Sequence, residues 1–316
     1  MWRRSDSKRF VPSDIGRRFR ASSFHDPATD RAQRQAARSE IHLDGYGQSQ
    51  IGTVRRINQD QFFTTPLETD PPGMNCFLGV ADGIGGAPGG EDASFLAVET
   101  LTRFVVEERD RLVHPDRGDG ELLQTLTRGL QRCHAELQEV VHRHPELSGM
   151  GTTMTAGLVL WPRLYVVHLG DARAYLCRGG RLRRLTHDHT YGQALLEAGV
   201  LNESTFQTSN MRNVLSNYLS GDLPERDPEV HPDAVVELLR PGDTLLFCTD
   251  GLTHVVSDPE LERHLSSDRS AKELCQILMG RARDLRARDD ATVLIARFDG
   301  SSGSRSGRRK PREGGA

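Results

Sequence analysis

The stretch VADGIGGAPGGEDAS, Val80–Ser94, contains five glycines and one proline directly after an apolar run, with a carboxylate, Asp82, ahead of the first glycine. Glycine-rich turns that follow strands often bind phosphate through backbone N–H groups. In a dinucleotide loop G-x-G-x-x-G counted from Gly83, however, the third glycine position holds Pro88, and the chain has no G-K-[S/T] element. We therefore expect no direct nucleotide cradle here, and a nucleotide-dependent enzyme is kept only as an alternative that calorimetry would test.

Four acidic residues share one sequence context, the end or the beginning of an apolar run that predicts a strand. Asp82 ends FLGVAD, Asp171 ends YVVHLGD, Asp250 ends LLFCTD, and Asp289 directly precedes DATVLIARF. Strand ends would hold these carboxylates at the rim of the core, where they can converge and repel one another. A hard cation such as Mg²⁺ or Mn²⁺ relieves that repulsion. Turn capping explains one such aspartate well but four poorly, so the pattern predicts a metal site that meets phosphate through its ions.

The charge is distributed unevenly along the 316 residues, although the formal net charge is only -3. Residues 1–40 hold 10 basic and 5 acidic side chains, residues 300–316 hold 5 and 1, and residues 41–299 carry a formal charge of -12. We predict a disordered basic N-terminal tail (1–40), a folded domain (41–299) and a disordered basic C-terminal tail (300–316). Solvated termini are the simpler interpretation of the tails, and electrostatic docking is the alternative.

Several functional classes are disfavoured by composition. No apolar run is long enough to span a membrane and no secretory signal is present, which predicts a cytoplasmic protein without a membrane span. Few aromatic residues stand among the basic ones, so no nucleic-acid partner is expected. The five cysteines are widely spaced and predict free, buried thiols rather than disulfides or a zinc site. His134, His142 and His144 do not share one helical face, so no metal role is predicted for them.

Helical periodicity predicts long helices over about 91–111 and 122–141 and a later helix over about 271–285. Between them, short β-rich runs from 152 to 186 predict antiparallel hairpins, and 234–250 predicts one more hairpin. The segment 191–232 predicts one short helix and a polar surface flap. Because strands and helices are segregated along the chain, an α+β fold is favoured over a doubly wound sheet.

Eight short motifs in this order resemble the metal-dependent Ser/Thr protein phosphatases of the type 2C family, particularly its compact bacterial members, over residues 44–298. They are GTVRRINQD, VADGIGG, GGEDAS, MGTTMTA, HLGDARAY, LTHDHT, FCTDGL and RDDATVLI. The resemblance implies a four-layer α-β-β-α sandwich of two antiparallel sheets flanked by helices. It also implies hydrolysis of phosphoserine and phosphothreonine on proteins through a metal-bridging hydroxide, with phosphorylated proteins and a cognate Ser/Thr kinase or its substrates as partners.

The resemblance also implies a metal-ligand set for two Mn²⁺ or Mg²⁺ ions. Asp82 would bridge both ions, the carbonyl of Gly83 would bind the second, and Asp250 and Asp289 would hold the first. Asp171, together with Asp250, would hold a third and weaker ion.

Two further residues receive catalytic roles from the resemblance. Asp60 would support metal-bound water, and Arg55 would bind the substrate phosphate with both arms of its guanidinium. His187 and His189 in LTHDHT are expected to be structural turn residues.

Three residues depart from the usual pattern of the family. Gln59 stands at a position that is often glutamate, Ile84 stands where animal relatives carry a histidine proposed as general acid, and Asp290 replaces an asparagine. Gln59 and Asp290 motivate an alternative function, a catalytically weak phosphoprotein-binding regulator with the same fold.

Overall fold

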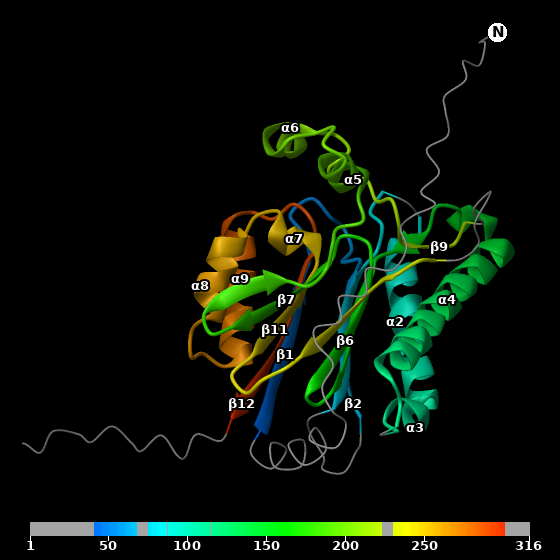
Figure 1. The fold of residues 1–316 in the computed structure, drawn as a ribbon. Coiled ribbons are helices and arrows are strands. Elements are labelled where there is room, and N and C mark those ends of the chain that lie inside the picture. Colours follow the sequence, from blue (N-terminus) through cyan, green and yellow to red (C-terminus); the bar gives the residue numbers. More distant parts are fainter. Residues whose placement is uncertain (1–40, 68–74, 87, 115, 223–229, 301–316) are drawn as a thin grey trace, which may run out of the picture.

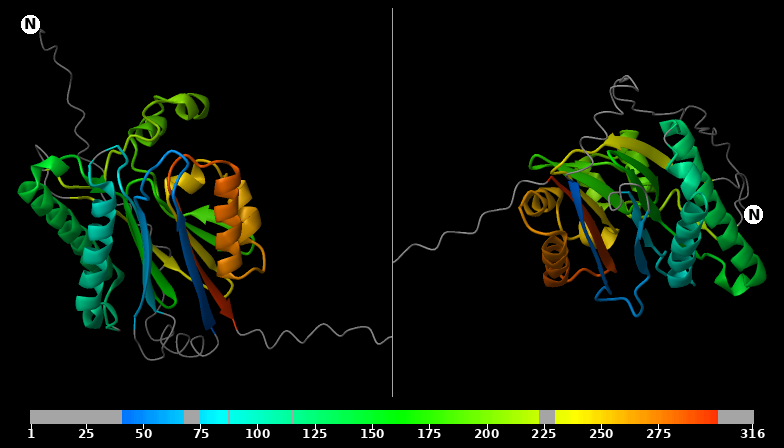
Figure 2. Two further views of the ribbon diagram at one scale, coloured as in Figure 1. Left: turned by 180° about the vertical axis from the view of Figure 1, so that it is seen from behind. Right: turned by 90° about the horizontal axis from the view of Figure 1, so that it is seen from below.

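The computed structural model describes residues 41–67, 75–86, 88–114, 116–222 and 230–300. Two five-stranded antiparallel sheets lie face to face, with helices against the outer side of each (Figures 1 and 2). The predicted α+β sandwich of four layers is confirmed. Apart from Gly300, the tails predicted at both ends fall outside the described residues. Among the helices described, none combines the length and the apolar character needed to cross a membrane.

The first sheet has the strand order β1-β12-β11-β7-β8. Its strands are β1 Ile41–Gln50, β7 Arg173–Arg178, β8 Arg181–Arg184, β11 Thr244–Cys248 and β12 Ala291–Gly300. The second sheet has the order β10-β6-β5-β3-β2. Its strands are β2 Asp60–Pro66, β3 Cys76–Asp82, β5 Met154–Leu160, β6 Arg163–Leu169 and β10 Asp233–Leu238, and a small ladder pairs β4 Gly151–Thr152 with β9 Leu219–Ser220.

Helices cover both outer faces and form the flap. The second sheet is covered by α2 and α4, and the first sheet by α8 and α9, while α5 and α6 project from one end of the sandwich (Figure 1). The helices are α2 Gly90–Glu107, α3 Arg109–Leu112, α4 Asp119–Arg143, η2 Pro145–Leu147, α5 Tyr191–Glu197, α6 Glu203–Thr208, α7 Asp250–Thr253, α8 Asp258–Leu265 and α9 Ala271–Asp284.

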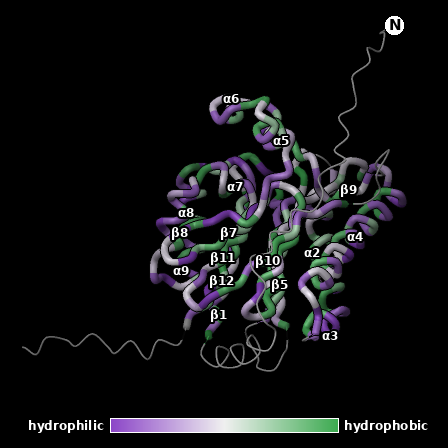
Figure 3. The backbone as a smooth tube through the Cα atoms, in the orientation of Figure 1, coloured by the Kyte–Doolittle hydropathy of each residue, from purple (hydrophilic) through white to green (hydrophobic). Residues whose placement is uncertain are grey.

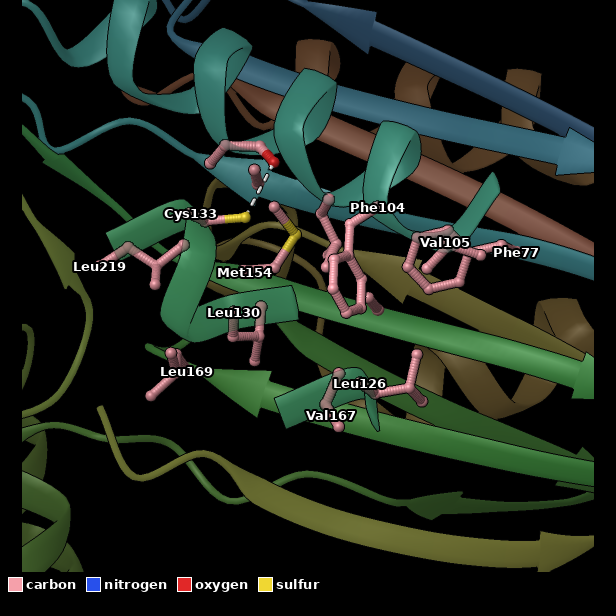
Figure 4. Packing of buried hydrophobic residues seen from close by; sticks show 14 of the residues in the cluster. Phe77, Phe104, Val105, Leu126, Leu130, Cys133, Met154, Val167, Leu169 and Leu219 are labelled. Atoms are coloured by element: carbon pink, nitrogen blue, oxygen red, sulfur yellow. Dashed lines mark hydrogen bonds between the residues drawn. The ribbon is translucent and has the colours of Figure 1, made fainter. Parts of the chain in front are cut away.

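Three hydrophobic clusters fill the spaces between the four layers. One joins α2 and α4 to the second sheet, where Leu126 and Leu130 pack among strand residues and the Cys133 thiol donates to the carbonyl of Ala97 (Figure 4). A second fills the space between the sheets, and a third joins the first sheet to the C-terminal helices. The central strands are accordingly largely hydrophobic along their length (Figure 3). The five cysteines are free and buried, as predicted.

The strand β3 shows how the period of two builds this arrangement. Its side chains point alternately to the two faces of the sheet. Leu78 and Val80 lie in the cluster between the sheets, whereas Phe77 and Ala81 lie in the cluster under the helices. Both faces of the strand are therefore buried, which explains its nearly continuous apolar sequence.

Several sequence expectations differ from the structure. The hairpin predicted over 234–250 is wrong, because β10 pairs with β6 of the second sheet and β11 pairs with β7 and β12 of the first. The chain thus changes sheets at the turn after Leu238, which turn residues alone do not reveal. The first long helix ends at Glu107, and a separate short helix follows it. The flap contains a second helix, started by a capping box at Asn202.

Candidate metal centre

In β2 and β3 the alternation of side chains between the two faces of the sheet continues past the apolar residues. It places one acid of each strand at one end of the core between the sheets. On β3, Asp82 follows Leu78 and Val80 on the same face. On β2, Asp60 shares its face with Phe62, which packs against that core. Asp60 and Asp82 are directly opposite each other in the β2–β3 ladder. The fold therefore brings these two carboxylates together at the edge of a dry interior.

Asp60 is 4% exposed and links the two sheets through its side chain. Its Oδ2 atom accepts hydrogen bonds of 2.7 Å from the hydroxyls of Thr249, which directly follows β11, and Thr292 of β12, on the side of the opposite sheet. Its Oδ1 atom is buried and has no hydrogen-bond partner among the described residues. Burial raises the pKa of this carboxyl to about 7, although the two hydroxyls act in the opposite direction.

Asp82, Asp171 and Asp250 show the same electrostatic signature. Burial raises the pKa of Asp82 well above its usual range, and the charges of Asp60 and Asp250 raise it further. Burial is also the main cause of the raised pKa values of Asp171 and Asp250. Oδ1 of Asp250 is a second buried carboxylate oxygen without a partner in the described part of the chain. Clustered, unsatisfied carboxylate oxygens are the donors that hard divalent cations take, so the residues present fit Mg²⁺ or Mn²⁺.

A pocket of about 830 Å³ opens above these acids, at the end of the sandwich where the flap projects. Six of the seven residues predicted for the site line it: Arg55, Asp82, Gly83, Asp171, Asp250 and Asp289. The seventh, Asp60, lies buried beside Asp82. The structure thus gathers all of the predicted residues, which come from both sheets.

Arg55 lines the pocket, but its guanidinium pairs with a predicted metal ligand. Its Nε and Nη2 atoms donate to Oδ1 and Oδ2 of Asp289, each at 2.6 Å. The guanidinium lies against Gly85, where a Cβ atom would collide with it. No three acidic, histidine or cysteine side chains of the described segments already stand in an arrangement that coordinates one ion. A metal at Asp289 would therefore compete with Arg55.

Asp290, which the sequence suggested as a weakness, anchors the loop that carries Arg55. The residue is 2% exposed. Its Oδ1 accepts the backbone N–H of Gly52 and its Oδ2 accepts that of Gln59, both at 2.8 Å. An asparagine has only one acceptor oxygen and would meet the second N–H with an amide donor. The carboxylate is therefore suited to holding both ends of the loop.

The histidines of LTHDHT lie at the base of the flap, as the structural interpretation predicts. The His189 N–H donates to the carbonyl of Gly170, and its Nε2 lies 3.2 Å from Asp233 Oδ2. Its ring packs on that of His168, a buried strand residue that sequence analysis did not single out. His134 is likewise buried and accepts from the backbone N–H of Ser220.

Comparison with known proteins identifies relatives of this chain. The family model described as Protein phosphatase 2C matches residues 47–288. The serine/threonine protein phosphatase PstP of Mycobacterium tuberculosis is 30% identical over 264 residues, which is 82% of this chain but 46% of that protein. The chain thus matches about half the length of that relative. The serine/threonine phosphatase stp of Listeria innocua is 30% identical over 245 residues, which is 77% of this chain and 91% of that protein.

Solved structures agree with these matches. The crystal structure of the Mycobacterium tuberculosis serine/threonine phosphatase PstP/Ppp superposes with a TM-score of 0.68 at 31% identity, covering 81% of this chain and 99% of that one. The catalytic domain of PstP in complex with two manganese ions gives a TM-score of 0.66 at 30% identity, covering 82% and 99%.

The buried carboxyl of Asp60 makes a prediction about pH. In the unfolded chain it releases its proton near pH 3.8, whereas in the folded, metal-free protein it keeps the proton up to about pH 7. The folded state therefore binds more protons in this window, and the free energy of unfolding falls as the pH rises through it. In Asp60→Asn we expect the decrease in the free energy of unfolding between pH 5 and 7 to be smaller than in wild type by about 1–3 kcal/mol. Urea unfolding in the presence of a chelator measures this free energy. The exposed control Asp110→Asn should behave as wild type, and equal slopes for Asp60→Asn and wild type would contradict the prediction.

The Arg55–Asp289 pair makes a second prediction. Arg55→Gln should tighten Mn²⁺ binding by about three- to tenfold, because it frees a ligand carboxylate and removes a positive charge from the site. Isothermal titration calorimetry on the metal-free protein measures this affinity. The neighbouring, exposed Arg56 provides the matched control as Arg56→Gln. Mn²⁺ binding that is unchanged or weaker in Arg55→Gln would show that the pair does not oppose metal binding.

Proposed function

Because the chain belongs to the protein phosphatase 2C family, we propose that it hydrolyses phosphoserine and phosphothreonine on proteins with two Mn²⁺ or Mg²⁺ ions. The observation that carries the proposal is the cluster of buried carboxylates under an open pocket, where one oxygen each of Asp60 and Asp250 has no hydrogen-bond partner among the described residues. The manganese-bound relative supports a metal-dependent activity. We assign the activity to the domain over 41–299.

The metal ligands of this proposal are Asp82, the carbonyl of Gly83, Asp250 and Asp289, with Asp171 available to a third, weaker ion. When bound, such ions supply a water of lowered pKa and neutralise charge on the phosphoryl group. Asp60 contributes through position: Thr249 and Thr292 hold its Oδ2, which leaves Oδ1 to accept a hydrogen bond from water.

Arg55 is the residue that we propose to bind the phosphoryl group of the substrate. Its planar fork matches two phosphate oxygens as it now matches the two oxygens of Asp289. If Asp289 were to hold a metal ion instead of Arg55, the guanidinium would be free to bind the phosphate. Asp290 keeps the loop of Arg55 in register, and Gly85 leaves room for the guanidinium. Ile84 lines the pocket without a proton donor, so protonation of the leaving oxygen falls to water or to another group of the site.

The proposed partners are phosphorylated proteins and a cognate Ser/Thr kinase or its substrates. A cytoplasmic location stays a prediction of the sequence. The catalytically weak regulator is less well supported, because Asp290, one of its two motives, has a positioning role and the named relatives are phosphatases.

Asp82→Asn and Asp250→Asn should each reduce Mn²⁺-dependent phosphate release from a phosphothreonine peptide by at least about a hundredfold, since each removes a ligand charge. The exposed Asp110→Asn again serves as control. Full activity in both site variants would overturn the assignment. Wild-type protein that binds the phosphopeptide but releases no phosphate would instead favour the regulator.

A further inference from the structure

Two arginines on the rim of the pocket have no partner in the described part of the chain. Arg286 and Arg288 are exposed, line the pocket beside Asp289, and make no side-chain hydrogen bond or ion pair within those residues. Several arginines elsewhere in the fold are committed to ion pairs, as Arg173 is with Asp188 and Arg178 with Asp243. The rim therefore presents two uncommitted guanidinium groups next to a phosphate-binding arginine.

The segment that carries these arginines is hydrogen-bonded directly to the loop of Arg55. The carbonyl of Ala287 accepts both the N–H and the hydroxyl of Thr53, at 3.0 and 3.1 Å. The carbonyl of Arg288 accepts the N–H of Val54 at 3.3 Å. At Gly52 the two segments approach so closely that a Cβ atom would collide with the backbone of Arg288 and Asp289. A group bound at Arg55 thus lies at a fixed distance from the rim.

The backbone of Arg286 favours a functional reason for its side chain. Its φ of 55° makes it the one non-glycine residue with positive φ in the described segments. Arg286 directly follows Leu285, the C-cap residue of α9. The N–H of Ala287 donates to the carbonyl of Ala282, which is the hydrogen bond of a Schellman turn. Glycine is preferred at this left-handed position because it has no Cβ atom. A long charged side chain is present here despite the strain, as occurs at binding sites.

We propose that Arg286 and Arg288 bind an anionic group that flanks the phosphorylated residue, so that the protein favours substrates with an acidic side chain or a second phosphate near the target. Guanidinium groups pair with carboxylates and phosphates through two parallel hydrogen bonds. The exposed apolar side chains of Val54 and Leu285 lie on the same rim and provide a surface for the peptide between the two anionic groups. The inference rests on the proposed phosphatase activity and names its substrate class.

The test compares kcat/KM for three phosphothreonine peptides whose flanking residues are alanine, glutamate or phosphoserine, with Mn²⁺ present. Wild type should favour the two anionic peptides by about three- to tenfold, and the preference should weaken at high salt. The phosphoserine and glutamate arms separate a second phosphate from an acidic side chain. In the double variant Arg286→Gln, Arg288→Gln the ratio should approach one. Arg283→Gln, exposed on the last turn of α9 and outside the pocket lining, is the matched control and should keep the wild-type ratio.

Arg286→Gly separates recognition from a structural role. Because glycine relieves the backbone strain, Tm should rise by about 2 °C while the preference for anionic peptides falls. A marked fall in Tm would make Arg286 a structural residue and overturn its assignment. Equal kcat/KM for all three peptides in wild type would overturn the inference and leave the phosphatase activity standing. No phosphate release from any peptide would refute the activity, and the inference with it.

Discussion

Asp60 lies between the two sheets, and the hydrogen bonds from Thr249 and Thr292 to its Oδ2 atom tie the β2 edge of one sheet to the opposite sheet. The positions of three other acids follow from this contact. Asp82 is opposite Asp60 in the same ladder, Asp250 directly follows Thr249, and Asp289 lies three residues before Thr292. One buried carboxylate therefore sets the spacing of ligands that belong to different sheets. Burial first, and then the neighbouring carboxylates, raise the pKa values of Asp60 and Asp82, so the ionised acids are unfavourable here without a cation.

The site has an acidic floor, formed by the clustered aspartates, and a basic rim, formed by Arg286 and Arg288. Different parts of the fold hold the floor and the rim in place. The floor depends on strand ends, which are fixed by the core between the sheets. The rim depends on two loops that Asp290 and the backbone hydrogen bonds around Thr53 hold together. Cations at the floor and guanidinium groups at the rim both attract anions, so a phosphoryl group and a neighbouring acidic group can be bound at once. Arg55 connects the two kinds of charge, because its guanidinium pairs with Asp289 of the floor.

The sequence predicted the floor better than the rim for a physical reason. Asp82 and Asp250 end apolar strands, and strand periodicity is visible in sequence, so their convergence could be inferred. The Arg55–Asp289 pair could not be inferred, since it depends on how the loop of Arg55 folds against the segment before β12, more than two hundred residues away. The positioning role of Asp290 has no signal in the sequence, because both of its N–H partners are backbone groups. The crossing of β10 and β11 into different sheets was missed because the turn between them resembles a hairpin turn.

The glycines of Val80–Ser94 act differently from those of a phosphate-binding loop. Gly85 leaves room for the guanidinium of Arg55, which comes from another segment. At Arg286 the relation is reversed, because a residue with a long side chain occupies a left-handed position that favours glycine. Both residues allow arginines to surround the pocket. Gly85 has no side chain that would displace Arg55, and Arg286 keeps its long side chain. Where the local preference for a residue type is violated next to the acids, recognition of an anion accounts for the violation better than stability does.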